Sequence, residues 1–256
     1  MRYLLKPVQY IYTIYCSLVF VTILLFIMPL VIIASFFGKI RGGNIITVLI
    51  RCWVFGLFLL CGIRHRNIWE TAHDSSRQYI FVTNHISFLD IPIIFKAIPH
   101  QKIRILGKYE LSKVPVFGFL YRHVVVMVDR SSQESRAKSV RQLKSVIKKG
   151  LSVYIFPEGT FNETGQPLKD FYDGAFRIAI ETQTPIKPIL FLDAYDRLNY
   201  RSLFSLNPGK CRAVYLEEIP VEGLTIKNTA ALKEKVFTVM EEALVRYNAS
   251  WINEHP

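Results

Sequence analysis

The chain has 256 residues, 51% of them hydrophobic, and its 32 Lys and Arg against 20 Asp and Glu give a formal net charge of +12. This apolar fraction exceeds that of a typical soluble domain and favours a soluble catalytic body with a membrane part, while the charge favours anionic partners. A nucleic-acid-binding protein is disfavoured because the cations are dispersed without a recognised module, and the four cysteines lack the spacing of a disulfide framework or a zinc site.

Two apolar segments open the chain. No formally charged residue stands between Lys6 and Lys39, and the stretch 10–37 exceeds the ~20 residues that a helix needs to cross the hydrocarbon core. The second segment, 45–63, carries Arg51 near its middle, where a charge at bilayer depth costs roughly 2.5–3.5 kcal/mol. We therefore expect a helical hairpin that dips into one leaflet, with a full span by the first segment as the alternative.

From about residue 77 the sequence alternates between strand and helix patterns. Runs rich in β-branched and aromatic residues predict strands at 79–83, 103–106, 124–128, 153–156, 186–192 and 212–216. Cap signals and apolar periodicity predict helices from Ser87, from Ser131 to Gly150, over 174–181 and over a final amphipathic stretch at 232–247. This order predicts an α/β fold: a mostly parallel sheet with flanking helices over 66–256, preceded by a membrane-associated two-helix element over 1–65.

One candidate catalytic group stands where the first of these strands ends. The segment Asn84-His-Ile-Ser-Phe-Leu-Asp90 leads from strand to helix, and ligands of α/β sheets sit beyond the carboxyl ends of the strands. A neutral imidazole accepts a proton near pH 7, and a carboxylate on its other nitrogen fixes its tautomer. His85 and Asp90 are thus a candidate base and its orienting partner. Alone the pattern is weak, since a chance His-x4-Asp match is expected about a third of the time and Asp90 as a mere helix cap is the alternative.

A second group, Phe156-Pro-Glu-Gly-Thr160, follows a later strand. The two groups in this order resemble the glycerolipid acyltransferase family, specifically its 1-acylglycerol-3-phosphate acyltransferases, and the resemblance covers roughly residues 77–192. Three further stretches look like blocks of the same family: Lys-Tyr-Glu-Leu-Ser-Lys-Val-Pro at 108–115, Val-Met-Val-Asp-Arg at 126–130 and Thr-Pro-Ile-Lys-Pro at 184–188. The apolar N-terminus is similar to the two-helix membrane element of some members.

The resemblance implies a set of roles for individual residues. His85 would be the catalytic base and Asp90 its carboxylate, while Arg130 would contact the acceptor phosphate. The other substrate-binding residues that it implies are Asn84, Lys108, Glu158, Gly159 and Thr160. The histidines at 65, 73, 100 and 255 lack the spacing of metal ligands, so we expect no metal site.

The resemblance also implies the reaction and its setting. A fatty acyl group would pass from acyl-CoA or acyl carrier protein to the free hydroxyl of 1-acylglycerol-3-phosphate, and the product would be phosphatidic acid for phospholipid synthesis. The thioester donor is expected to be a substrate, with no further cofactor. The expected partners are the phospholipid membrane, lysophosphatidic acid and the donor. The expected location is the membrane, with the catalytic domain on the cytoplasmic face, which is the inner membrane in a bacterium.

Two departures from the family pattern leave the acceptor open. Phe161 stands where the family commonly has Arg, and Tyr172-Asp173 stand where Lys is common, so two cations that would hold a phosphate are missing. Lys169 is a candidate replacement. One alternative is therefore another lysolipid acceptor, such as lyso-ornithine lipid. A second alternative is a non-catalytic, membrane-anchored lipid-binding protein, against which the intact His85 and Asp90 pair argues.

Overall fold

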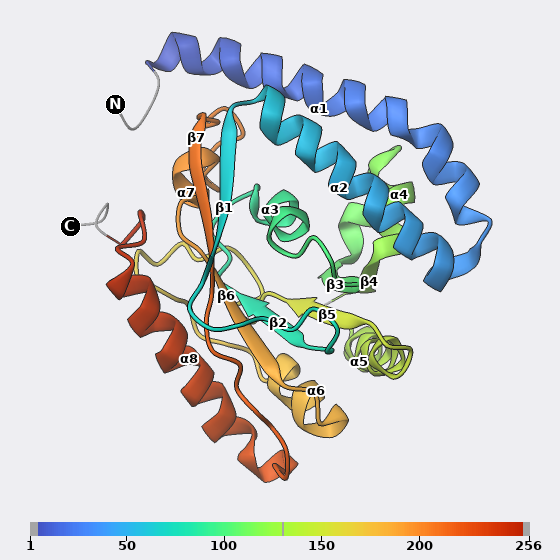
Figure 1. The fold of residues 1–256 in the computed structure, drawn as a ribbon, viewed down its shortest axis with the longest axis vertical. Helices are drawn as coiled ribbons and strands as arrows, with labels where there is room; N and C mark the ends of the chain where they lie inside the picture. Colours follow the sequence, from blue (N-terminus) through green and yellow to red (C-terminus); the bar gives the residue numbers. More distant parts are fainter. Residues whose placement is uncertain (1–4, 130, 253–256) are drawn as a thin grey trace.

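The computed structural model describes residues 5–129 and 131–252, so Arg130, the predicted phosphate ligand, lies outside the described residues. Two long apolar helices, α1 (Lys6–Ser35) and α2 (Gly43–Leu60), pack against each other and are joined by a π-helical turn, η1 (Gly38–Gly42) (Figure 1). Both helices are long and apolar enough to cross a membrane by length and composition, which indicates membrane association.

Two arginines tie this hairpin to the rest of the protein. Arg51 of α2 donates hydrogen bonds to the carbonyls of Ile98 (2.9 Å) and Gln101 (2.5 Å), so its charge faces the protein body. Arg104 donates to the carbonyls of Lys39 (2.9 Å) and Ile40 (3.2 Å), which satisfies backbone acceptors of the turn between the helices. Because one hydrophobic core runs from the hairpin into the body, α2 is held as a structural element of the fold.

Seven strands of the described residues form one sheet in the order β1-β7-β6-β2-β5-β3-β4. The five strands from β6 to β4 are parallel, whereas β7 runs antiparallel to β6 and β1 runs parallel to β7. The predicted mostly parallel sheet is confirmed. The strands are β1 (Ile63–Trp69), β2 (Ile80–Thr83), β3 (Ile103–Lys108), β4 (Val125–Val128), β5 (Ser152–Ile155), β6 (Ile186–Phe191) and β7 (Gly209–Tyr215).

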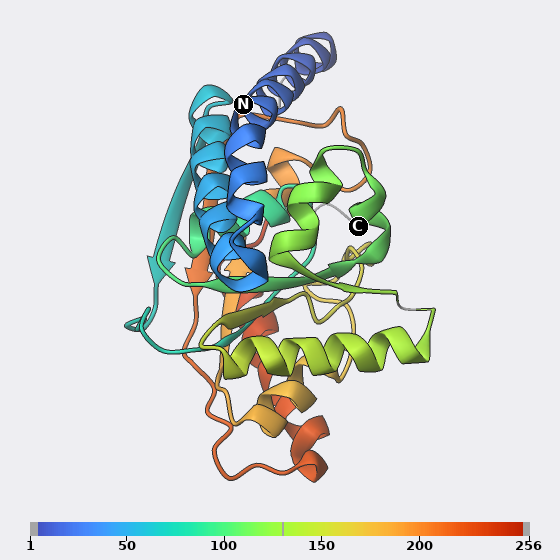
Figure 2. The same ribbon diagram turned by 90° about the vertical axis from the view of Figure 1, so that its right-hand side faces the viewer.

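Helices cover both faces of this sheet, as Figures 1 and 2 show. The hairpin, α3 and α4 lie on one face, and α5, α6 and α8 lie on the other. The short α7 lies at the edge of the sheet where β7 begins. The bounds are α3 (Asp90–Ala97), η2 (Tyr109–Lys113), α4 (Phe117–Val124), α5 (Gln133–Lys148), α6 (Gly174–Thr182), α7 (Ala194–Arg197), η3 (Ile226–Asn228) and α8 (Thr229–Arg246).

Several boundaries differ from the prediction. The helix expected from Ser87 begins at Asp90, and the cap of α5 is Ser132, whose hydroxyl accepts the Ser135 amide at 3.2 Å, where Ser131 was predicted. Strand β1 was not predicted, because its sequence alternates apolar residues with cations next to an apolar helix. The boundary set at residue 65 falls inside β1, and the division into 1–65 and 66–256 stays a prediction.

The strand register brings the two candidate groups, at 84–90 and 156–160, to the same height on the sheet. Val82 of β2 pairs with Ile155 of β5, so His85 and Glu158 each stand three residues beyond a paired position. Both loops leave the sheet at the carboxyl ends of parallel neighbouring strands, where α/β proteins bind ligands. The candidate site is therefore built by adjacent strands.

Candidate active site

The imidazole of His85 is held by the carboxylate of Asp90. His85 Nδ1 lies 2.8 Å from Asp90 Oδ2, and the same oxygen accepts the backbone amides of Ile86 and Ser87, each at 2.8 Å. With Nδ1 as the donor, Nε2 is the nitrogen that is left to accept a proton. Asp90 therefore holds the backbone of the loop through two amides and sets the tautomer of the base.

Asp90 is fully buried, and this burial raises its pKa, although the hydrogen bond and charge of His85 and the two amides oppose the rise. The carboxylate thus depends on these three donors to remain ionised. In contrast, the side chain of His85 is 18% exposed, so the ring reaches the surface of the site while its partner does not.

Aromatic rings surround the imidazole. The ring of Phe156 stacks on that of His85, with centroids 4.0 Å apart and an angle of 24°, and the ring of Phe161 lies 4.4 Å away at 56°. Phe161 in turn contacts Phe88 edge-on at 5.1 Å and Tyr200 at 6.1 Å. The base therefore works beside an apolar wall, which strengthens electrostatic interactions at the ring.

Glu158 acts on the backbone of the site. It is fully buried, and its two carboxylate oxygens accept the amides of His85 (2.7 Å) and Lys169 (2.9 Å). Burial raises the pKa of Glu158 to about 8, and the two amide bonds oppose this rise. We infer that Glu158 fixes the position of the base, while the direct acceptor contact implied by the resemblance stays a prediction.

The turn after Glu158 presents a hydroxyl and a cation to the site. Gly159 has φ +75°, a left-handed conformation that glycine adopts without strain. Thr160 is exposed, and its hydroxyl accepts a hydrogen bond from the ammonium of Lys169 at 2.9 Å. Lys169 thus stands beside the exposed Thr160, and its role as a replacement for the missing cations stays a prediction.

Two further predicted site residues, Asn84 and Lys108, differ in burial and in their position relative to His85. Asn84 is buried, and its amide both donates to and accepts from the backbone of Phe191 on β6 (3.1 and 2.9 Å), so it clamps two strands beneath His85. Lys108 is exposed at the end of β3, two strands from β2, a separation of about 10 Å from the usual strand spacing. The substrate-binding roles predicted for both residues remain predictions, as does that of Arg130.

Some residues of the site were not identified from the sequence. The backbone amide of Asn162 donates to the carbonyl of His85 at 2.7 Å, and Ser87 donates its hydroxyl to the carbonyl of Leu198 at 2.5 Å. Tyr200 reaches Phe161 from a loop more than a hundred residues away from His85 in sequence. Only the turn-forming run after Thr160 gave a signal for Asn162, and the sequence offered none for Tyr200.

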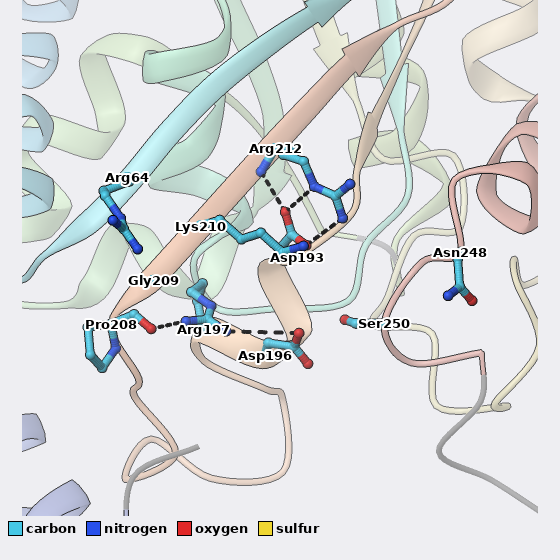
Figure 3. Close-up of a pocket in the computed structure, with 10 residues that line it drawn as sticks. All are labelled: Arg64, Asp193, Asp196, Arg197, Pro208, Gly209, Lys210, Arg212, Asn248 and Ser250. Carbon is cyan, nitrogen blue, oxygen red and sulfur yellow. Dashed lines mark hydrogen bonds and ion pairs between the residues drawn. The ribbon is translucent and has the colours of Figure 1, made fainter. Parts of the chain in front are cut away.

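A cavity of about 440 Å³ opens at the same edge of the sheet, between the starts of β1 and β7 and the helix α7 (Figure 3). Arg212 binds Asp193 there with two side-chain hydrogen bonds of 2.8 and 2.7 Å, and Arg64 and Lys210 face the opening from neighbouring strands. His85 does not line this cavity, whose charged lining consists of four cations and the two acids Asp193 and Asp196.

Comparison with known proteins gives consistent similarities. A family model described as Acyltransferase matches residues 65–192. The chain is 31% identical to 1-acyl-sn-glycerol-3-phosphate acyltransferase of Cocos nucifera over 81% of this chain and 66% of that protein. It is 29% identical to 1-acyl-sn-glycerol-3-phosphate acyltransferase beta of Homo sapiens over 64% of this chain and 59% of that protein. The chain thus spans less than two thirds of these two relatives.

The fold has a counterpart among solved structures. The crystal structure of the 1-acyl-sn-glycerophosphate (LPA) acyltransferase, PlsC, from Thermotoga maritima superposes with a TM-score of 0.77 at 22% sequence identity. The match covers 98% of this chain and 99% of that one, so the similarity includes the apolar hairpin as well as the α/β body.

Proposed function

Because this chain belongs to the acyltransferase family, we propose that it transfers a fatty acyl group from a thioester donor to the free hydroxyl of 1-acylglycerol-3-phosphate, forming phosphatidic acid. The observation that carries the proposal is the hydrogen bond between His85 Nδ1 and the buried Asp90, with the ring partly exposed at the carboxyl edge of the sheet. A pure lipid-binding protein has no use for a base that is oriented in this way.

In the proposed mechanism, Nε2 of His85 takes the hydroxyl proton while the acceptor oxygen attacks the thioester carbonyl. A carbon–oxygen bond forms, the carbon–sulfur bond breaks, and the leaving thiolate takes the proton back from the imidazolium. A positioned base of this kind contributes typically ~10²–10⁴-fold. These steps balance without any cofactor besides the donor, and we propose none.

Direct transfer is preferred over an acyl-enzyme. Ser87, two residues after His85, is buried, donates its hydroxyl to the carbonyl of Leu198 and accepts the backbone amide of Leu89 at 2.9 Å. A serine that is engaged on both sides is poorly placed to attack a thioester. Acyl-CoA or acyl carrier protein is the proposed donor, and the net charge of +12 supports an anionic one.

The hairpin gives the proposed reaction its location. The outer face of α1 exposes many large apolar side chains, whereas α2 is packed against the body. We propose that α1 lies in one leaflet, where the lysolipid and its product are both held by their acyl chains, and that the α/β body lies on the cytoplasmic face. Apolar burial of this kind is the driving force of interfacial helices.

The test is release of free CoA from palmitoyl-CoA in mixed micelles, with lysophosphatidic acid, with lyso-ornithine lipid or without acceptor. We expect release that depends on lysophosphatidic acid, formation of phosphatidic acid, and loss of both in His85→Ala. Release that depends on lyso-ornithine lipid would show that this lipid is the acceptor. If palmitoyl-CoA gives no release with any acceptor, the assay is repeated with acyl carrier protein as the donor. Full activity in His85→Ala would exclude the mechanism.

A further inference from the structure

The loop between α7 and β7, residues 198–208, exposes two large apolar side chains at its tip: Leu203 is 61% and Phe204 50% exposed. Hydrogen bonds within the loop hold its shape. The Ser205 hydroxyl donates to the Ser202 carbonyl at 2.6 Å and accepts the backbone amide of Asn199 at 3.0 Å, and the backbone amide of Phe204 donates to the Ser202 hydroxyl at 3.1 Å. A loop that is built to hold two apolar side chains in solvent is typical of an interaction surface.

The surface is continuous with α1. The ring of Phe204 lies 5.5 Å from that of Tyr10, which belongs to the exposed apolar face of α1, and Figure 2 shows the orange loop reaching the N-terminal half of that helix. A partner that covers α1 therefore meets Leu203 and Phe204 as well. The proposed partner of α1 is a membrane.

The charges around the loop fit the same partner. Residues 198–208 contain Arg201 and no acidic residue. Arg64 and Lys210 lie side by side on β1 and β7 and face the cavity next to the loop (Figure 3). The four cations that line this cavity outnumber its two acids, Asp193 and Asp196. An apolar tip with cations behind it is the pattern expected at the headgroup region of a bilayer that contains anionic lipids.

The base of the loop is connected to the candidate active site. Leu198 accepts the hydroxyl of Ser87, two residues from His85, and Asn199 forms a β-bridge with Ser87. Tyr200 packs on Phe161, whose ring contacts that of His85. The tip and the catalytic base are thus linked through consecutive residues of one ordered loop.

We propose that loop 198–208 is a second membrane contact, which inserts Leu203 and Phe204 into the leaflet beside α1 and thereby positions the aromatic wall over His85. The inference rests on the proposed membrane association of α1. The occupant is the surface of a phospholipid bilayer.

The contact is tested with single tryptophan additions in the full chain. Phe204→Trp reports on the loop, Phe26→Trp on α1, where Phe26 is 81% exposed, and Ile226→Trp on the distant η3, which also exposes an apolar residue. Each is mixed with vesicles of phosphatidylcholine and phosphatidylglycerol carrying brominated acyl chains. The quenching of the wild type, with Trp53, Trp69 and Trp251, is subtracted.

We expect quenching at positions 26 and 204 and none at 226. Quenching at 26 without quenching at 204 would overturn the loop contact and leave the membrane association of α1 intact. If neither is quenched, the membrane association fails and the loop contact fails with it. None of these readouts requires enzyme activity, so failure of the proposed reaction is recognised separately.

The link to the active site is tested with Leu203→Ser/Phe204→Ser, and Ile226→Ser serves as the matched control. We expect the activity of the double variant toward a long-chain acceptor embedded in vesicles to be about 10-fold lower than that of the wild type, because the two apolar side chains no longer insert into the bilayer. Activity toward a monodisperse short-chain acceptor should stay within about twofold of the wild type, since no bilayer is engaged. Equal loss on both acceptors, or no loss on either, would overturn the proposed coupling.

Discussion

The carboxylate of Glu158 accepts the backbone amide of His85 at 2.7 Å, so the second buried acid of the site acts on the main chain of the base, while Asp90 acts on its ring. Glu158 and Asp90 thus both position the imidazole, through different atoms of His85. One fixes where the residue stands, and the other fixes how its ring is turned.

Replacement of Asp90 tests the orientation of the ring. Asp90→Asn keeps the size of the side chain but removes the charge that holds the Nδ1–H tautomer and stabilises the imidazolium. We expect kcat to fall by about 10³-fold or more, as in other His–Asp pairs. Steady-state acyl transfer measures this, with Asp170→Asn on the surface as the control and a thermal unfolding curve to verify folding. Activity within tenfold of the wild type would contradict the role of Asp90.

Glu158 predicts a pH dependence of stability. Burial raises its pKa from 4.5 to about 8. As the pH rises between these values, the unfolded chain ionises while the folded carboxyl keeps its proton, so the folded state loses stability, and the loss is complete above the folded pKa. We expect Tm of the wild type in detergent to fall more steeply from about pH 5 to about pH 8 than Tm of Glu158→Gln. The raised pKa of Asp90 acts in the same direction in both proteins, so the difference isolates Glu158. Parallel curves would show that Glu158 titrates normally.

Lys169 predicts a difference in acceptor binding. Its ammonium lies 2.9 Å from the Thr160 hydroxyl at the opening of the site, where it is placed to meet a phosphate. We expect Lys169→Met to raise KM for lysophosphatidic acid about 10-fold, the usual size of one charge-assisted hydrogen bond, with a small effect on kcat. The effect should disappear with an uncharged monoacylglycerol acceptor. Lys148→Met, on the exposed face of α5, is the control; an equal rise in KM for both acceptors would exclude phosphate binding by Lys169.

Replacement of Arg51 tests how much its hydrogen bonds from the hairpin contribute to the stability of the fold. Arg51→Met leaves the carbonyls of Ile98 and Gln101 without their charged donor, and an unsatisfied buried carbonyl costs about 1–3 kcal/mol. We therefore expect a clear decrease in Tm in detergent, compared with Arg66→Met at an exposed position of β1. An unchanged Tm would mean that the two hydrogen bonds are replaced by water.

Much of this arrangement follows from local sequence patterns. The strand-end positions of His85 and Glu158 were predictable, because β-branched runs mark β2 and β5 and parallel strands bring their carboxyl ends together. The contact of Glu158 with the His85 amide was not, since it joins residues that are 73 positions apart in the sequence.

Other features depend on contacts between distant segments. Asn84 was predicted to bind substrate, but its bonds to Phe191 join two strands that are separated by about a hundred residues of sequence. β1 could not be recognised because it is an edge strand, which among the described residues pairs with β7 alone and needs no continuous apolar pattern. Tyr200 became part of the site only through the fold of the α7–β7 loop.

The way in which the hairpin joins the sheet limits how this protein can be made soluble. A shortened chain that starts at residue 66 would cut β1 within its first half and leave β7 without a full partner along its outer side. It would also uncover core positions now shielded by Trp53, Leu57 and Phe58 of α2. Truncation should thus give an aggregating protein, and detergent-free preparations are better sought through polar substitutions on the outer face of α1.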